Sequence, residues 1–157
     1  MKILLPVDGS DVSLEAVRCV ICMARAGLAT SVVLANVQEA ATLYELVVAH
    51  DPQVLAQVSA AAGAHTLLAA QALLDAAGIA YESEIASGDP AHTIIDILER
   101  YECDMVVMGA SGTSSLRSAL LGSVSNEVLH AAPVPVMIVK AGEAPAPDGP
   151  ADGEIEP

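Results

Sequence analysis

Short aliphatic runs alternate with longer amphipathic stretches along this chain. Near-continuous aliphatic runs cover residues 3–7, 31–37, 105–108 and 134–139, and residues 79–86 form a further, more alternating segment. Near-continuous apolar runs are typical of strands that are buried on both faces of a sheet. The pattern therefore predicts five strands.

The stretches between these runs have the periodicity and the end signals of helices. Ser10 or Asp11 is suited to cap the first helix and Gly27 to end it, whereas Asp51-Pro52 opens the second and Gly78 ends it. A third helix is expected from the turn at residues 87–90 to Tyr101, and a fourth over residues 124–131. Residues 38–50 fit either a short helix or a connection. Strands that alternate with helices predict an α/β fold, a doubly wound parallel sheet of five strands with helices on both faces.

A glycine-rich segment follows the fourth strand. Gly109-Ala110-Ser111-Gly112 is separated by nine residues from Gly122-Ser123, which precedes the last helix. Glycines allow backbone N–H groups to approach an anion closely, and a helix start offers unpaired donors with a favourable dipole. The pattern G-x2-G-x9-G-[S/T] therefore indicates a phosphate site and makes nucleotide binding the leading hypothesis.

Asp8 stands at the end of the first strand, as Gly109 does at the end of the fourth. In doubly wound sheets, ligands bind beyond the carboxyl ends of strands where the strand order reverses. If these two strands are neighbours there, Asp8 can accept a hydrogen bond from a ribose hydroxyl or an adenine amino group. Alternatively, Asp8 is a turn residue that caps the next helix together with Gly9 and Ser10.

The amino-acid composition argues against a nucleic acid or a membrane as the partner of this chain. The formal net charge is −14 with only 6 Lys and Arg residues, and Phe and Trp are absent. A phosphate backbone would be repelled, and no platform of stacked rings is available, so a nucleic-acid partner is not expected. Residues 52–74 carry no charged side chain, but Gln, Ser, Thr and His interrupt them, which favours a surface helix over a membrane span. With no sign of a signal peptide, a cytoplasmic location is expected.

The three cysteines are an odd number, which argues against a disulfide framework. Cys19 and Cys22 form a C-x2-C pair, but inside the first predicted helix rather than at its start, where redox pairs gain their low pKa. We therefore expect Cys19, Cys22 and Cys103 to be buried structural thiols.

Several segments together resemble the ATP-binding branch of the universal stress proteins, from residue 1 to about residue 140. The matching stretches are Lys2-Ile3-Leu4-Leu5-Pro6-Val7-Asp8-Gly9-Ser10, Gly88-Asp89-Pro90, Met105-Val106-Val107-Met108-Gly109-Ala110-Ser111-Gly112, Leu120-Leu121-Gly122-Ser123-Val124-Ser125 and Ala132-Pro133-Val134-Pro135-Val136-Met137-Ile138-Val139. The resemblance implies the strand order 3-2-1-4-5 and an ATP, with Mg²⁺, over the point where that order reverses. It covers one nucleotide-binding domain, residues 1–140, and leaves residues 141–157 as an acidic tail that we expect to be disordered.

The resemblance also implies roles for individual residues. Pro6, Val7 and Asp8 would bound the adenosine, Val37 would pack on the adenine, and Met108 and Gly109 would line base and ribose. The phosphates would follow Gly112 and the loop toward Arg117, and end at Gly122, Ser123, Val124 and Ser125. One departure is Asn36, where the family often has His.

The chemistry expected of this site is binding rather than fast turnover. A Walker P-loop, a dinucleotide fingerprint, a G-x-S-x-G elbow and an H-E-x-x-H motif are all missing from the sequence. No catalytic base or arginine cluster accompanies the glycine loop, and phosphoryl transfer depends on positioned positive charge. The favoured function is a nucleotide-dependent stress-response regulator, with a slow ATPase or a nucleotide-free dimeric scaffold as alternatives. The resemblance further implies a homodimer through the last strand, from Val134 to Val139.

Overall fold

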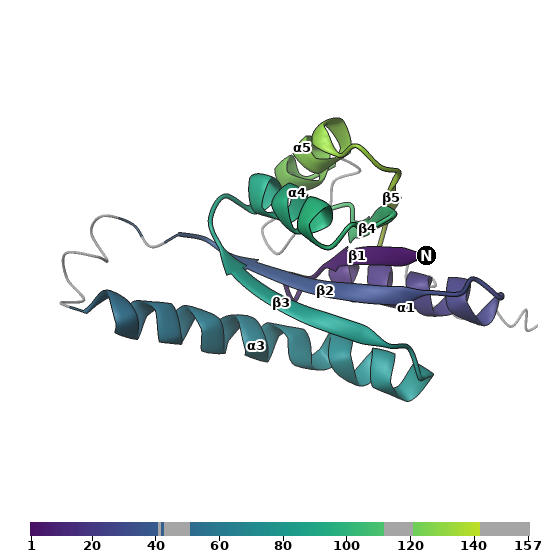
Figure 1. Ribbon diagram of the computed structural model, residues 1–157, viewed down its shortest axis with the longest axis horizontal. Coiled ribbons are helices and arrows are strands. Elements are labelled where there is room, and N and C mark those ends of the chain that lie inside the picture. The colour runs from purple at the N-terminus through teal and green to yellow at the C-terminus, as the bar shows by residue number, and fades with distance from the viewer. Residues whose placement is uncertain (41, 43–50, 112–120, 142–157) are drawn as a thin grey trace, which may run out of the picture.

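Five strands form one sheet in the computed structural model, which describes residues 1–40, 42, 51–111 and 121–141 (Figure 1). The strand order is β3-β2-β1-β4-β5, and all four neighbouring pairs are parallel. The predicted doubly wound sheet and its strand order are confirmed. The strands are β1 (Lys2–Pro6), β2 (Ser31–Gln38), β3 (Tyr81–Ser87), β4 (Met105–Gly109) and β5 (Val136–Val139).

Two layers of helices cover the sheet. Figure 1 shows α4 (Pro90–Arg100) and α5 (Ser123–Ala131) on one face, and α1 (Asp11–Arg25) and α3 (Pro52–Ala77) on the other. Each layer seals its own aliphatic cluster against the sheet. Successive side chains of a strand point to opposite faces of the sheet, and each helix turns one side toward it. The molecule therefore has three layers, with the sheet in the middle.

β1 occupies the middle of the sheet and is buried on both faces. Ile3 and Leu5 pack toward α1 and α3, whereas Leu4 packs toward α4 and α5, and all three side chains are fully buried. This two-sided burial explains why the strand is a continuous apolar run rather than an alternating one.

Side chains fix where the helices begin. The Ser10 hydroxyl accepts from the Ser13 N–H at 3.2 Å, which settles Ser10 rather than Asp11 as the cap of α1. The Asp51 carboxylate caps α3 in the same way. α3 ends at Gly78, whose φ of 68° lies in the left-handed region that glycine adopts without strain.

Two strands begin two residues later than the sequence predicts. β5 begins at Val136 rather than Val134, because Pro133 and Pro135 have no N–H to donate to the ladder. β3 begins at Tyr81 because the N–H of Ile79 is used at the end of α3, where it donates to the Leu74 carbonyl at 3.1 Å. Helix termination and proline chemistry therefore shorten both strands.

The prediction for the cysteines is wrong for Cys22. Cys22 is exposed and Cys19 is half-buried, because the buried side of α1 is formed by Val17, Val20 and neighbouring residues. Cys103 is buried as expected, and burial raises the pKa of its thiol.

Within the described part of the chain, the first three turns of α3 contribute no buried residue. Between Pro52 and Ala62 no residue is buried, and Val54 and Val58 are exposed, whereas burial begins at Gly63. No helix in the described residues is both long enough and apolar enough to span a membrane. The acidic tail predicted from residue 141 onward lies, beyond its first residue, outside the described part of the chain.

Leu67→Ala should destabilise the protein strongly, whereas Leu68→Ala should not. Leu67 is fully buried between α3 and the sheet, while its neighbour Leu68 is 56% exposed. Truncating a buried leucine costs about 2–5 kcal/mol, and a surface substitution changes stability by less than about 0.5 kcal/mol. Urea unfolding followed by circular dichroism measures both. Equal losses would mean that α3 does not pack as described.

Candidate functional site

A pocket of about 570 Å³ opens at the carboxyl ends of β1, β2 and β4. β1 is followed by α1 on one face of the sheet, while β4 leads toward α5 on the other face, so the chain diverges between these two strands. The pocket therefore lies where ligands bind in doubly wound sheets, and its size is typical of small-molecule sites.

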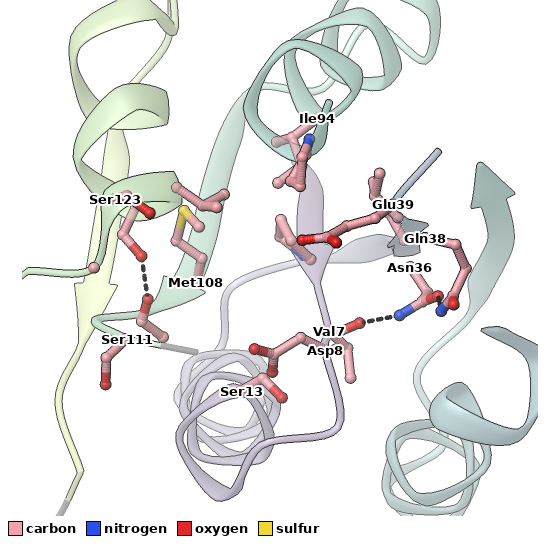
Figure 2. A pocket seen from close by; sticks show the side chains of 18 residues that line it. Val7, Asp8, Ser13, Asn36, Gln38, Glu39, Ile94, Met108, Ser111 and Ser123 are labelled. Carbon is pink, nitrogen blue, oxygen red and sulfur yellow. Dashed lines mark hydrogen bonds between the residues drawn. The ribbon is translucent and has the colours of Figure 1, made fainter. Parts of the chain in front are cut away.

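The structure brings most of the predicted site residues to this pocket. Gly112 and Arg117 lie outside the described residues, so their placement stays a prediction. The other ten line the pocket: Pro6, Val7, Asp8, Val37, Met108, Gly109, Gly122, Ser123, Val124 and Ser125. Figure 2 shows Met108 and Ser123 on one side of the opening and Asn36, Gln38 and Glu39 on the other.

Asp8 belongs both to the pocket and to the turn that starts α1. Its Oδ1 accepts from the N–H of Ser10 at 3.0 Å and from the Ser10 hydroxyl at 2.6 Å. The two roles considered for Asp8 are thus compatible, since the turn holds the carboxylate at the edge of the pocket.

Gly109 is required by packing at the end of β4. A Cβ atom at this position would lie 2.8 Å from Val12 Cγ1 and 3.1 Å from the Val12 carbonyl carbon. The backbone of β4 therefore approaches the first turn of α1 more closely than any side chain allows. This contact brings the start of α1 against the strand that bears the glycine segment.

The start of α5 presents backbone donors at the pocket. Gly122 is the N-cap residue, and no side chain caps the helix. The N–H of Gly122 itself donates to the Ala110 carbonyl at 2.7 Å, so the available donors belong to the next residues, Ser123 to Ser125. The buried Ser125 hydroxyl donates to the Gly109 carbonyl at 2.8 Å and ties the helix to β4. This arrangement suits an anion.

Asn36 extends the pairing of β1 with β2 by a side-chain bond. Its Nδ2 donates to the Val7 carbonyl at 2.8 Å, and its Oδ1 accepts from Gln38 Nε2 at 2.6 Å (Figure 2). The backbone N–H of Val7 already donates to the Ala35 carbonyl at 2.8 Å. Asn36 is buried, so it fixes Val7 at the floor of the pocket rather than presenting a free amide.

The described lining of the pocket carries negative charge. Asp8 and Glu39 are its ionisable residues, and no Lys or Arg lies among the lining residues described. A polyphosphate there needs backbone donors and an accompanying cation to offset these carboxylates. Mg²⁺ is usually held by one or two carboxylates together with substrate phosphates, so this donor set fits a Mg²⁺ ion.

The family model of the universal stress protein family matches residues 1–140. This chain belongs to the universal stress protein family. A universal stress protein of Methanocaldococcus jannaschii is 31% identical over 139 residues, which are 88% of this chain and 81% of the relative. The universal stress protein YxiE of Bacillus subtilis is 29% identical over 145 residues, 88% of this chain and 98% of the relative.

Solved structures agree with this assignment. Hypothetical protein MJ0577 has a TM-score of 0.78 and 26% identity, over 91% of this chain and 97% of its own. A universal stress protein in complex with cAMP has a TM-score of 0.61 and 25% identity, over 88% and 95% of the two chains. The universal stress protein fold, with its 3-2-1-4-5 sheet, is therefore present here.

Sequence reasoning missed part of this universal stress protein pocket. Pro90 and Ile94 reach it from α4, whose start follows the end of β3 at the same edge of the sheet. The sequence could have predicted them, because the start of the helix after β3 has to lie at the carboxyl edge of the sheet, where the pocket opens. The remaining residues that were not predicted are Ser13, Ala35, Asn36, Gln38, Glu39 and Ser111.

Asn36→Ala should destabilise the protein more than Gln38→Ala does. Without the Asn36 amide, the carbonyl of the buried Val7 loses the partner described above, at a cost of about 1–3 kcal/mol. Gln38 is half-buried, and its removal leaves an oxygen of Asn36 that solvent can reach more easily. Urea titration of both variants tests the order. A larger loss for Gln38→Ala would contradict it.

Proposed function

We propose that this universal stress protein binds ATP with Mg²⁺ in the pocket and acts as a nucleotide-dependent stress-response regulator in the cytoplasm. The observation that carries the proposal is the uncapped start of α5 at one end of a pocket whose other end is formed by β1 and β2. A ligand with an anionic end and a flatter apolar end fits this pocket, with the anion at the start of α5 and the apolar end at β1 and β2.

The nucleoside would lie at the β1–β2 end. Val7 and Val37 supply apolar surface there, Met108 adds to it from β4, and Asp8 supplies an acceptor for a ribose hydroxyl or an adenine amino group. Because the Oδ1 of Asp8 is held by Ser10, this acceptor has a fixed position before any ligand arrives.

The phosphates would lie at the start of α5. Ser123, Val124 and Ser125 form the first turn of α5 and line the pocket, and the N–H donors and dipole of a helix start favour an anion there. Gly112 and Arg117 would extend this end, as the family resemblance implies. Mg²⁺ would accompany the phosphates, and Asp8 and Glu39 are the carboxylates of the described lining.

Relatives support an adenine nucleotide. The universal stress protein that was crystallised with cAMP is 25% identical to this chain and shares its fold. cAMP carries one phosphate, whereas the resemblance of the glycine segment implies a longer polyphosphate, so the competing ligands have to be compared directly.

Regulation rather than catalysis follows from the charges of the site. Fast phosphoryl transfer depends on positioned positive charge, and the described lining residues include none. Slow ATP hydrolysis is the alternative, and the release of phosphate by the purified protein separates the two. Release at a rate of turnovers per second would favour the enzyme.

We further propose a homodimer through the last strand, from Val134 to Val139. Among the described strands β5 pairs only with β4, so its other edge has no neighbouring strand. The Val106 N–H donates to the Pro135 carbonyl and the Ala110 N–H to the Val139 carbonyl. Backbone groups of odd-numbered residues therefore face β4, and those of Val136 and Ile138 face outward, ready to pair with a second copy.

Gly122→Val should abolish ATP binding while leaving the fold intact. The φ of −64° at Gly122 suits valine, but the branched side chain would crowd the phosphates at the start of α5. Losing two charge-assisted hydrogen bonds of about 1.5–3 kcal/mol each weakens binding by roughly a hundredfold or more. Calorimetry with ATP, AMP, cAMP and inorganic triphosphate measures affinity and stoichiometry, which should be near one ATP per chain.

The matched control for this experiment is Ala131→Val, at the exposed far end of α5. It places the same valine side chain at the other end of α5 and should leave ATP affinity unchanged. Unchanged affinity in Gly122→Val would place the nucleotide elsewhere. Tighter binding of cAMP than of ATP would keep the pocket but replace its ligand.

Ile138→Pro should give a monomer, whereas Ile138→Ala should remain a dimer. Both substitutions remove the half-buried isoleucine side chain, but only proline removes the outward N–H that a second copy would use. Light scattering at tens of micromolar, about the range where weak contacts are populated, reports the mass. A monomeric wild type would rule out the dimer.

A further inference from the structure

Three side chains that can bind a metal converge on the outer side of the α4–α5 layer. Asp89 precedes α4, His92 lies in its first turn, and Glu127 projects from α5. Their ligand atoms all lie within 4.8 Å of one another, and all three residues are exposed. None of them lines the pocket described above, so the cluster is separate from the proposed nucleotide site.

We propose that Asp89, His92 and Glu127 form a binding site for a divalent transition-metal ion of the Zn²⁺ class that links α4 to α5. The site combines one imidazole nitrogen with carboxylates from two different helices, and water can complete the coordination because the cluster is open to solvent. This is not a run of acidic side chains on one element, since each helix contributes part of the ligand set.

Local hydrogen bonds hold two of the ligands in place. Asp89 Oδ1 accepts from the backbone N–H of His92 at 3.0 Å, which is the N-cap bond of α4, and lies 2.8 Å from His92 Nδ1. These two bonds hold the Asp89 carboxylate and the His92 ring next to each other at the start of α4. Neither Asp89 Oδ2 nor His92 Nε2 takes part in these two bonds.

The spacing suits a transition metal after a small adjustment. Zn²⁺ binds nitrogen and oxygen ligands at about 2.0–2.2 Å, so two of its ligand atoms lie at most about 4.4 Å apart. The side chains of Asp89 and His92 are 58% and 78% exposed, so rotation into this range meets little resistance. Mixed nitrogen and oxygen ligands favour Zn²⁺, Ni²⁺ or Cu²⁺ over Mg²⁺ and Ca²⁺, which take oxygen ligands.

The charges around the cluster favour a cation. The carboxylates of Asp89 and Glu127 supply negative charge within the cluster, and Asp96 is a further acidic residue of α4. The whole chain, with a net charge of −14, attracts cations to its surface.

A metal at this position would stiffen two walls of the pocket. α4 contributes Pro90 and Ile94 to the lining, and α5 contributes Val124 and Ser125. Linking the two helices on their outer side restricts how far these walls can separate. The metal site is nevertheless defined by its own ligands, and its existence does not depend on the nucleotide.

The test is calorimetric titration of the nucleotide-free, chelator-treated full chain with ZnCl₂ at constant pH. A Cys22→Ser background removes the exposed thiol as a competing ligand. We expect one Zn²⁺ per chain, and at least tenfold weaker binding in His92→Gln, in Glu127→Gln and in Asp89→Asn, which can still cap α4. Circular dichroism confirms that each variant is folded.

His130→Gln is the matched control, because His130 is an exposed histidine on the same helix as Glu127. It should leave Zn²⁺ affinity unchanged. Equal affinity in all variants, or a loss in His92→Gln without one in Glu127→Gln, would overturn the proposal of a site shared by both helices.

Discussion

β1 lies between β2 and β4 with its Ile3, Leu4 and Leu5 side chains fully buried, so both its backbone edges and both its faces have to be satisfied by other elements. This requirement places helices on both sides of the sheet. α1, the helix after β1, and α5, the helix after β4, lie on opposite faces, and the pocket opens between the carboxyl ends of these two strands. The pocket thus lies at the carboxyl end of the buried central strand.

In the described part of the proposed nucleotide site, backbone geometry rather than charged side chains would hold the anion. Gly109 lets β4 approach the first turn of α1, and the Ser125 hydroxyl ties α5 to the same strand. These contacts fix the helix start against the strand end. An acidic protein can therefore present a local anion site, because N–H dipoles act over a few ångströms while the net charge acts diffusely through screening solvent.

Much of this architecture could be predicted from the sequence, because aliphatic runs and helix caps are local signals. The five strands, the capping residues and ten members of the pocket follow from such signals and from the family resemblance. Strand order came from the resemblance alone, since the pairing of β1 with β4 joins residues far apart in the chain. Cys22 and the role of Asn36 could not be read in advance, because the side of a helix that faces the core and the partner of a buried amide are set by tertiary packing.

α3 meets the sheet closely at Gly63, where a Cβ atom would lie 2.6 Å from Ile85 Cγ2 and 2.9 Å from Asn36 Oδ1. Before this point the helix is exposed, and after it Leu67, Ala70 and Leu74 are fully buried. The helix therefore consists of two parts with different local stability. Amide hydrogens between Pro52 and Ala62 should exchange with solvent through local fraying, while those after Leu67 exchange only through global unfolding. The boundary between the two parts of α3 lies at Gly63, beside Asn36. Local fraying of residues 52–62 is therefore expected to stop before it reaches this residue of the pocket lining.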